Sequence, residues 1–293
     1  MNSPLSLEQL LFREYTVILD GKIIAWKMYE ELKIQVSNST KKATLWAVLV
    51  WDNEVSLRYI KQKRKFAEKI WMGFELFRYP EDISEDELVK ELHILNENSE
   101  VSGYIVQLPL PSHINSIRVI ENISPKKDVD WFHPENQWKV VIWDSSWFPP
   151  CTPAGVIKML EYYDISLTWK KVSIIGRSNI VWKPLTQMCI NAGATVSCLN
   201  SSTPDIAEYT WNSDIVISAT GQANILKADM IDKKCVVIDV WFSVIDGKIH
   251  GDADYESILA RWNAITPVPG WVGPMTVAML LTNTYRAHCL SYE

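Results

Sequence analysis

Residues 171–200 read KVSIIGRSNIVWKPLTQMCINAGATVSCLN, and this stretch decides the fold class. The apolar run KVSII predicts a buried strand, and the glycine in GRSN predicts a turn. A helix-like segment follows, and ATVSCL at 194–199 predicts a second strand. A strand, a helix and a strand in this order form a βαβ unit, in which the two strands are parallel.

Two further short apolar runs lie downstream, SDIVISATG at 213–221 and KCVVIDV at 234–240. They extend the prediction to an open parallel sheet with helices on both faces, which is a Rossmann-like doubly wound fold. The first half of the chain also alternates between strand-like and helix-like segments, as in ATLWAVLVW at 43–51 and SLRYIKQKRKFAEKI at 56–70. We therefore predict an α/β protein, with an N-terminal α/β domain before the doubly wound one.

A proline-rich, aromatic stretch at 124–154 interrupts this alternation and indicates the crossing between the two domains. We predict a first domain at 1–148 and a second at 149–274. The segment GPMTVAMLLTNTYRA at 273–287 is strongly apolar. We therefore expect the C-terminal helix, at 275–293, to pack back on the first domain.

Composition narrows the class of protein. The 293 residues are 47% hydrophobic, which is enough to build a core in two domains of ordinary size. The sequence has no apolar run of membrane-helix length and no secretory signal pattern at its start, so we expect a cytoplasmic protein without a membrane partner. A net charge of −6 argues against a nucleic-acid partner. The five cysteines lack the spacing of a metal site.

Gly176, Arg177 and Ser178 follow the strand KVSII and precede a helix. Glycine in such a turn lets the backbone approach a pyrophosphate, and the helix N-terminus favours negative charge. Arg177, with Ser201 just after the second strand, suits an adenosine 2′-phosphate, and no acidic residue ends that strand to bind a ribose diol. The pattern favours NADP and does not exclude NAD. The structural alternative is a glycine turn that binds no dinucleotide.

Four polar residues of the first domain are candidates for the chemistry. Tyr59 and Lys63 stand four residues apart, on one face of a predicted helix, and can form a general acid/base pair. Gln107 interrupts an apolar predicted strand at 102–111, where it needs a hydrogen-bond partner, and Asp130 lies in the crossing segment. The alternatives are a surface Tyr–Lys pair, a glutamine bonded to nearby backbone, and an aspartate in a turn or helix cap.

Residues 266–276, TPVPGWVGPMT, predict a stiff loop that leads into the last helix. Its prolines and glycines, Pro269 and Gly270 among them, give a rigid backbone whose polar groups can face a ligand. A purely structural loop is the alternative.

These elements, in this order, resemble the bifunctional methylenetetrahydrofolate dehydrogenase/cyclohydrolase family from about Thr16 to Ala287. The resemblance is carried by YIVQLPLP, KDVDWFHPEN, PCTPAGV, IIGRSNIVWKP, ATV, SDIVISATG, VVIDV, HGDADY and ITPVPGWVGPMTVAMLLTNT. It implies a folate-binding catalytic domain followed by an NAD(P)-binding domain. It also implies oxidation of 5,10-methylenetetrahydrofolate to the 5,10-methenyl form by NADP, and hydrolysis of that cation to 10-formyltetrahydrofolate.

The same resemblance implies roles for the candidate residues. Lys63 is the implied catalytic lysine, with Gln107 holding it in place and Tyr59 stacking on or hydrogen-bonding the substrate. Asp130 is implied to bind the pterin ring. The resemblance further implies a substrate site that includes Pro269 and Gly270, and a homodimer formed through the cofactor domain. The implied cofactor-binding residues are Gly176, Arg177, Ser178, Ser201 and Phe242.

Two alternatives remain within this resemblance. One is a dehydrogenase of the same family that lacks cyclohydrolase activity, and the other is a catalytically inactive folate-binding homologue. The presence of Tyr59, Lys63, Gln107 and Asp130 argues for both activities.

Tryptophan and glycine occur in abnormal numbers, 14 and 11, whereas glycine averages roughly 7% of residues in proteins. The resembled family has glycine at nine positions that hold tryptophan here: Trp51, Trp71, Trp131, Trp138, Trp143, Trp169, Trp182, Trp241 and Trp271. An indole cannot replace glycine where φ is positive or where backbone must approach a ligand. We therefore hypothesise that the gene reads UGA as glycine and that these tryptophans are a mistranslation. A genuinely tryptophan-rich and inactive protein is the alternative.

Overall fold

The computed structural model describes residues 17–144, 146, 148–179, 181–261, 263–270 and 272–292. The chain divides into two compact units. The four-stranded unit contains Thr152–Thr276 and the chain up to Ile24, and the three-stranded unit contains Ala25–Cys151 and the chain from Val277 onward. The domain bounds given above, 1–148 and 149–274, stay a prediction, because a compact unit is not by itself a functional domain.

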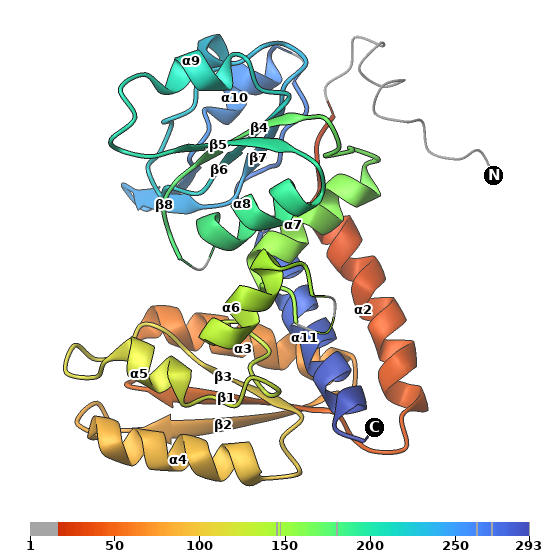
Figure 1. Ribbon diagram of the computed structural model, residues 1–293, viewed down its shortest axis with the longest axis vertical. Helices are drawn as coiled ribbons and strands as arrows, with labels where there is room; N and C mark the ends of the chain where they lie inside the picture. Colours follow the sequence, from red (N-terminus) through yellow and green to blue (C-terminus); the bar gives the residue numbers. More distant parts are fainter. Residues whose placement is uncertain are drawn as a thin grey trace. The chain divides into compact units, whose positions relative to one another are not determined.

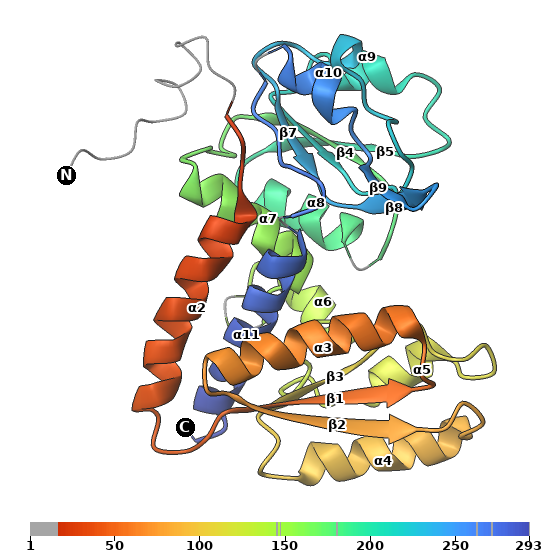
Figure 2. The same cartoon turned by 180° about the vertical axis from the view of Figure 1, so that it is seen from behind.

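The three-stranded unit is built on a parallel sheet of order β2-β1-β3. Figures 1 and 2 show α3 on one face of this sheet and α4 on the other. The strands are β1 (Thr44–Val50), β2 (Gly73–Tyr79) and β3 (Gly103–Val106). The helices are α2 (Gly21–Asn38), α3 (Glu54–Lys69), α4 (Glu85–Glu97), α5 (Ser116–Glu121), α6 (Pro134–Val141) and α11 (Val272–Leu290), of which α2 and α11 cross from one unit to the other.

The alternation of side chains along β1 decides which helix covers which face. Val48 and Val50 join a buried cluster with Leu88 and Leu92 of α4. The residues between them point to the opposite face of the sheet, because successive side chains of a strand alternate. Both faces of β1 are therefore buried, as expected for a central parallel strand.

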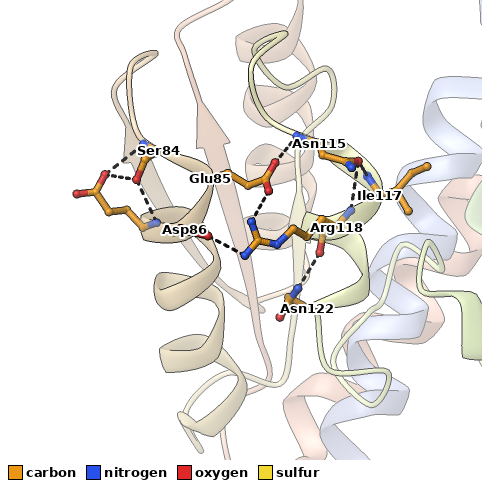
Figure 3. A network of polar contacts seen from close by, with 8 residues as sticks. Ser84, Glu85, Asp86, Asn115, Ile117, Arg118 and Asn122 are labelled. Atoms are coloured by element: carbon orange, nitrogen blue, oxygen red, sulfur yellow. Dashed lines mark hydrogen bonds and ion pairs between the residues drawn. The ribbon is translucent and has the colours of Figure 1, made fainter.

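The start of α4 is fixed by two sets of polar contacts. The Ser84 hydroxyl accepts from the backbone N–H of Glu87, and the Glu87 carboxylate accepts from the backbone N–H of Ser84, which together form a capping box. Arg118 of α5 pairs with both Glu85 and Asp86, as Figure 3 shows. The hydrogen bond from the backbone N–H of Asn115, together with the one from Arg118, holds the pKa of Glu85 below its ordinary value. These exposed contacts set the register of α5 against α4.

The four-stranded unit has a parallel sheet of order β5-β4-β6-β7 and a separate antiparallel hairpin. Helices α9 and α10 lie on one face of the sheet, and α7 and α8 on the other (Figures 1 and 2). The strands are β4 (Lys171–Ile175), β5 (Thr195–Leu199), β6 (Ile215–Ser218), β7 (Val236–Asp239), β8 (Phe242–Ile245) and β9 (Lys248–Gly251). The helices are α7 (Cys151–Tyr162), α8 (Trp182–Asn191), α9 (Ile206–Thr210), α10 (Tyr255–Leu259) and the 3₁₀ turn η1 (Ala228–Met230).

The doubly wound parallel sheet predicted from residues 171–200 is confirmed by this topology. Strands β6 and β7 are buried along their whole length, and such strands are short apolar runs that can be recognised in the sequence. One local expectation was wrong, because the strand expected at 102–111 spans only Gly103–Val106. Ile18 forms a single bridge with Ile265, and Asn53 caps α3.

No helix in the described ranges is long and apolar enough to cross a membrane.

Candidate functional site

Lys63 and Gln107 meet in the three-stranded unit. The Nζ atom of Lys63, on α3, donates to Oε1 of Gln107 at 3.1 Å. Gln107 follows β3 directly, and its backbone N–H continues the sheet by donating to the carbonyl of Val48 at 2.9 Å. The Gln107 amide also donates to the carbonyl of Leu108 at 2.8 Å, so the glutamine side chain is fixed at both ends. A fixed glutamine oxygen holds the Nζ atom of Lys63 in one place.

Asp130 and Lys63 are far apart in sequence, yet both lie close enough to the Cys151 thiol for their charges to shift its pKa. Burial raises the pKa of this thiol well above its ordinary value, and the Asp130 carboxylate acts in the same direction. Tyr59, one turn before Lys63 on α3, is 38% exposed, which leaves its ring accessible to a ligand. The structure thus brings Lys63, Gln107 and Asp130 into one region.

A buried carboxylate that sequence reasoning missed shapes the turn that carries Asp130. Asp128 is fully buried and accepts from the backbone N–H groups of Phe132 and His133 at 3.1 and 2.8 Å. It also accepts from the amide of Asn136 at 2.9 Å, while its burial raises its pKa. Asp130 is held inside this loop of hydrogen bonds. The signal was present in the block KDVDWFHPEN, which contains Asp128 and Asn136 as well.

Asn283 of α11 is a second residue that sequence reasoning missed. Its amide donates to the carbonyls of Val129 and Pro149 at 3.0 and 2.8 Å, and its side chain lies 3.6 Å from the sulfur of Cys151. Asn283 is 1% exposed. A polar residue in an apolar helix needs such partners, and this was its sequence signal.

The first candidate for cofactor binding is the turn after β4. Gly176 has a φ of +138°, and a Cβ atom placed there would lie 2.7 Å from the carbonyl oxygen of Ala219. Only glycine fits this close approach between the turns that follow β4 and β6. These two strands are neighbours in the sheet order β5-β4-β6-β7, and the order reverses between them. Ligands of doubly wound sheets bind at this reversal, outside the carboxyl ends of the strands.

The other predicted cofactor residues surround the same edge of the sheet. Arg177 and Ser201 are exposed, directly after Gly176 and shortly after β5. The Ser178 hydroxyl accepts from the backbone N–H groups of Val181 and Trp182 at 3.2 and 3.4 Å, where the chain enters α8. Phe242, 40% exposed, opens β8.

Two indoles lie against the glycine turns of this edge. The Trp182 indole lies 3.6 Å from the position of a Cβ at Gly176, and its Nε1 donates to the carbonyl of Ile174 at 3.2 Å. The Trp241 ring lies 2.9 Å from the position of a Cβ at Gly221. This agrees with the expectation that some of the tryptophans intrude on backbone turns of this kind.

Pro269 and Gly270 lie in the four-stranded unit, whereas Lys63 lies in the other one. Gly270 has a φ of +147°, and the Lys22 side chain comes within 3.1 Å of the position that a Cβ would take there. The loop therefore requires glycine at this position. Trp271, which follows, lies outside the described residues.

Comparison with protein families identifies two domains. The family "Tetrahydrofolate dehydrogenase/cyclohydrolase, catalytic domain" matches residues 19–130. The family "Tetrahydrofolate dehydrogenase/cyclohydrolase, NAD(P)-binding domain" matches residues 150–292. Together they span most of the chain.

Individual relatives agree. The bifunctional protein FolD of Aquifex aeolicus is 45% identical over 276 residues, which cover 93% of this chain and 95% of that protein. Among solved structures, the FolD dehydrogenase/cyclohydrolase of Campylobacter jejuni superposes with a TM-score of 0.91 at 41% identity, covering 94% of this chain and 99% of that one. The enzyme of Trypanosoma brucei, solved with NADP cofactor and an inhibitor, gives a TM-score of 0.89 at 32% identity, with 95% and 99% covered. The chain therefore belongs to the tetrahydrofolate dehydrogenase/cyclohydrolase family.

Proposed function

We propose that this enzyme oxidises 5,10-methylenetetrahydrofolate with NADP and hydrolyses the methenyl product to 10-formyltetrahydrofolate, with Lys63 as the catalytic lysine. The observation that carries the assignment of Lys63 is its 3.1 Å hydrogen bond to Gln107, close to Asp130. Gln107 is the positioning residue for Lys63, Asp130 binds the pterin ring, and Tyr59 stacks on or hydrogen-bonds the substrate.

In the first step, the loss of hydride from the methylene carbon, the protein needs to supply little chemistry of its own. The methylene carbon lies between two nitrogens, whose lone pairs stabilise the cation that remains when hydride leaves, so the protein mainly orients the substrate. NADP, when bound, supplies the hydride acceptor. Water then adds to the methenyl carbon, and the Lys63 amine takes the proton that this water loses. Opening of the bond to one nitrogen leaves the formyl group on the other.

The residues after β4 fit an NADP cofactor. Gly176 leaves room for a pyrophosphate beside the backbone, and the exposed guanidinium of Arg177 can pair with a 2′-phosphate. Ser178 shapes the turn before α8 by accepting from the backbone N–H groups of Val181 and Trp182, and Ser201 follows the next strand. Phe242 is assigned to the nicotinamide end, and Pro269 and Gly270 to the substrate.

The β8–β9 hairpin supports a homodimer formed through the cofactor domain. Val244 and Ile249 are paired across it and are 62% and 44% exposed, beside the exposed Phe242. Exposed apolar residues on a short hairpin are typical of an interface that a second chain covers. We also propose a cytoplasmic location and a supply of formyl groups to purine biosynthesis.

Two rate measurements on the purified protein test this function. We expect methylenetetrahydrofolate to drive NADPH formation, and added methenyltetrahydrofolate to lose its absorbance without NADP. NADPH formation with no acceleration of methenyl hydrolysis would identify a monofunctional dehydrogenase. Folate binding with neither reaction would identify an inactive homologue.

A further inference from the structure

The turn after β6 lines the cofactor edge of the four-stranded sheet, and one buried carboxylate holds it. Asp252 is fully buried, and its Oδ2 atom accepts from the Ser218 hydroxyl at 2.9 Å and from the backbone N–H of Thr220 at 2.5 Å. Ser218 is the last residue of β6, and Thr220 is in the turn that follows. Asp252 therefore joins the end of the strand to the turn.

The same turn is tightened by two further features. The hydroxyl of Thr220 accepts from the backbone N–H of Gln222 at 3.0 Å, and Gly221 has a φ of +72°. Ala219, at the start of the turn, meets Gly176 from the turn after β4. A shift of the turn after β6 would therefore change the space at the sheet reversal where a dinucleotide binds.

The burial of the Asp252 carboxylate lowers the stability of the fold, which points to a role beyond folding. The second oxygen of Asp252, Oδ1, is buried and has no hydrogen-bond partner among the described residues. A buried carboxylate with an unpaired oxygen destabilises a fold. From this geometry we propose that Asp252 is a positioning residue for NADP. Asp252 acts on the NADP site through the backbone of Thr220. The proposal rests on the function proposed above.

Substitutions at Asp252 separate this role from a general structural one. Asp252→Ala should raise KM for NADP about tenfold or more while methenyl hydrolysis, which uses no NADP, keeps its rate. Asp252→Asn keeps an acceptor oxygen for both donors and should restore most of the lost affinity. Asp254→Ala is the matched control, because Asp254 caps α10 two residues away. It should leave KM for NADP unchanged.

If Asp252→Ala does not fold, Ser218→Ala gives the answer with a smaller change, since it removes one of the two donors. A severalfold rise in KM for NADP alone supports the proposal. An unchanged KM, or equal loss of both activities in the soluble variants, overturns it. An unmodified protein without either activity would instead refute the proposed function.

A second inference rests on backbone angles. Eight described residues other than glycine have positive φ, and three of them are asparagine or aspartate, which tolerate this region. The other five are all tryptophan: Trp51 (75°), Trp71 (64°), Trp131 (71°), Trp143 (56°) and Trp169 (66°). Each belongs to the nine positions singled out from the sequence.

Four helix ends in the described part of the chain share one hydrogen-bond pattern. After α7, Asp164 donates to the carbonyl of Glu161 and Ile165 to that of Leu160, with the aspartate at a φ of +57°. After α8, Gly193 donates to the carbonyl of Ile190 and Ala194 to that of Cys189, a Schellman motif with glycine in its left-handed position. After α3, Trp71 and Met72 make the corresponding bonds to Glu68 and Ala67. After α6, Trp143 and Asp144 bond to Val140 and Lys139 in the same way. Two tryptophans thus occupy the position that glycine takes in α8.

Packing does not account for the indoles of Trp143 and Trp169. Trp169 is 92% exposed and Trp143 is 64% exposed. Trp169 is the third residue of a turn closed by a bond from the Lys170 N–H to the carbonyl of Leu167, where positive φ favours glycine. Burial of apolar surface, the usual gain from tryptophan, is nearly absent at Trp169.

We infer that the source cell incorporates glycine at these five positions, through one codon that it reads as glycine and that was translated as tryptophan. Peptide mass spectrometry of the protein purified from its source cell tests this directly. The expected peptides carry glycine at all five positions. Tryptophan in those peptides overturns the inference.

Stability of the recombinant protein gives an independent check. Trp143→Gly and Trp169→Gly should each raise the melting temperature, by about 2–4 °C. Trp211→Gly is the control, because Trp211 ends α9 at a φ of −60°, where glycine gains nothing, and it should not raise the melting temperature. Equal or lower stability of the first two variants would contradict the inference.

Discussion

The candidate sites of the two units of this enzyme differ in what forms them, which is side chains in one unit and backbone in the other. In the three-stranded unit the site consists of polar side chains, Lys63 on Gln107 with Asp130 nearby. In the four-stranded unit it consists of backbone turns, where Gly176 approaches Ala219 because it has no side chain. The first site is therefore damaged by removing atoms, and the second by adding them. Each of the following variants should affect one site and spare the other.

The largest effect is expected at Lys63. Lys63→Ala should abolish cyclohydrolase activity and strongly reduce dehydrogenase activity, a loss of about 10²–10⁴-fold for a general base. The fold should survive, because alanine favours the helix. Lys61→Ala, an exposed neighbour on α3, is the control. Undiminished methenyl hydrolysis in Lys63→Ala would remove this residue from the mechanism.

Adding one methyl group at Gly176 should damage the other site. In Gly176→Ala the new Cβ would lie 2.7 Å from the Ala219 carbonyl at a φ of +138°, so we expect KM for NADP to rise about 100-fold. Methenyl hydrolysis should continue. Gly247→Ala is matched to it, because Gly247 has a φ of +73° with nothing within 4 Å of the added atom. If both variants lose NADP binding equally, the close approach at Gly176 is not the cause.

A side chain also contributes to the cofactor site, and its loss should change specificity. Arg177→Ala should raise KM for NADP by about 10–100-fold and KM for NAD far less, because a guanidinium pairs bidentately with a 2′-phosphate. Kinetics with the two cofactors measure this difference, and Lys183→Ala on α8 is an exposed basic control. Equal changes for both cofactors would assign Arg177 to the pyrophosphate or to structure.

The smallest effect is expected at Asp130. Asp130→Ala should weaken folate binding about tenfold through the loss of a charge-assisted hydrogen bond. Calorimetric titration with a folate measures the Kd, and Asp144→Ala, at the exposed end of α6, is the control. An unchanged Kd would end the assignment of the pterin ring to Asp130.

The contrast between the units also explains what the sequence could predict. Buried parallel strands are short apolar runs, so residues 171–200 were enough to predict the doubly wound sheet. Tyr59 and Lys63 were found because helical spacing is regular. Polar residues that act through the backbone, such as Asp128 and Asp252, have no such spacing, since their partners are set by the path of the chain.

Local backbone geometry was predicted less well. Gln107 was expected inside a strand, but the strand ends one residue earlier, and its side chain turns to Lys63 and to its own backbone. The alternative of a glutamine bonded to neighbouring backbone was therefore partly right. Ser178 was expected to bind the cofactor, a role that stays a prediction, and its hydroxyl accepts from backbone N–H groups at the start of α8. The spacing of apolar residues in the sequence does not show which polar side chains will hydrogen-bond to nearby backbone.

The path of α11 has a consequence for how this protein can be inherited. The helix starts in the four-stranded unit and ends in the three-stranded one, where Asn283 donates to the carbonyls of Val129 and Pro149. Further along it, His288 contacts the hydroxyls of Ser39 and Ser102 at 3.0 and 3.1 Å. A contiguous N-terminal fragment would lose all of these bonds. An exchange of only the N-terminal half of the gene would therefore replace the partners of Asn283 and His288 while leaving these two residues unchanged.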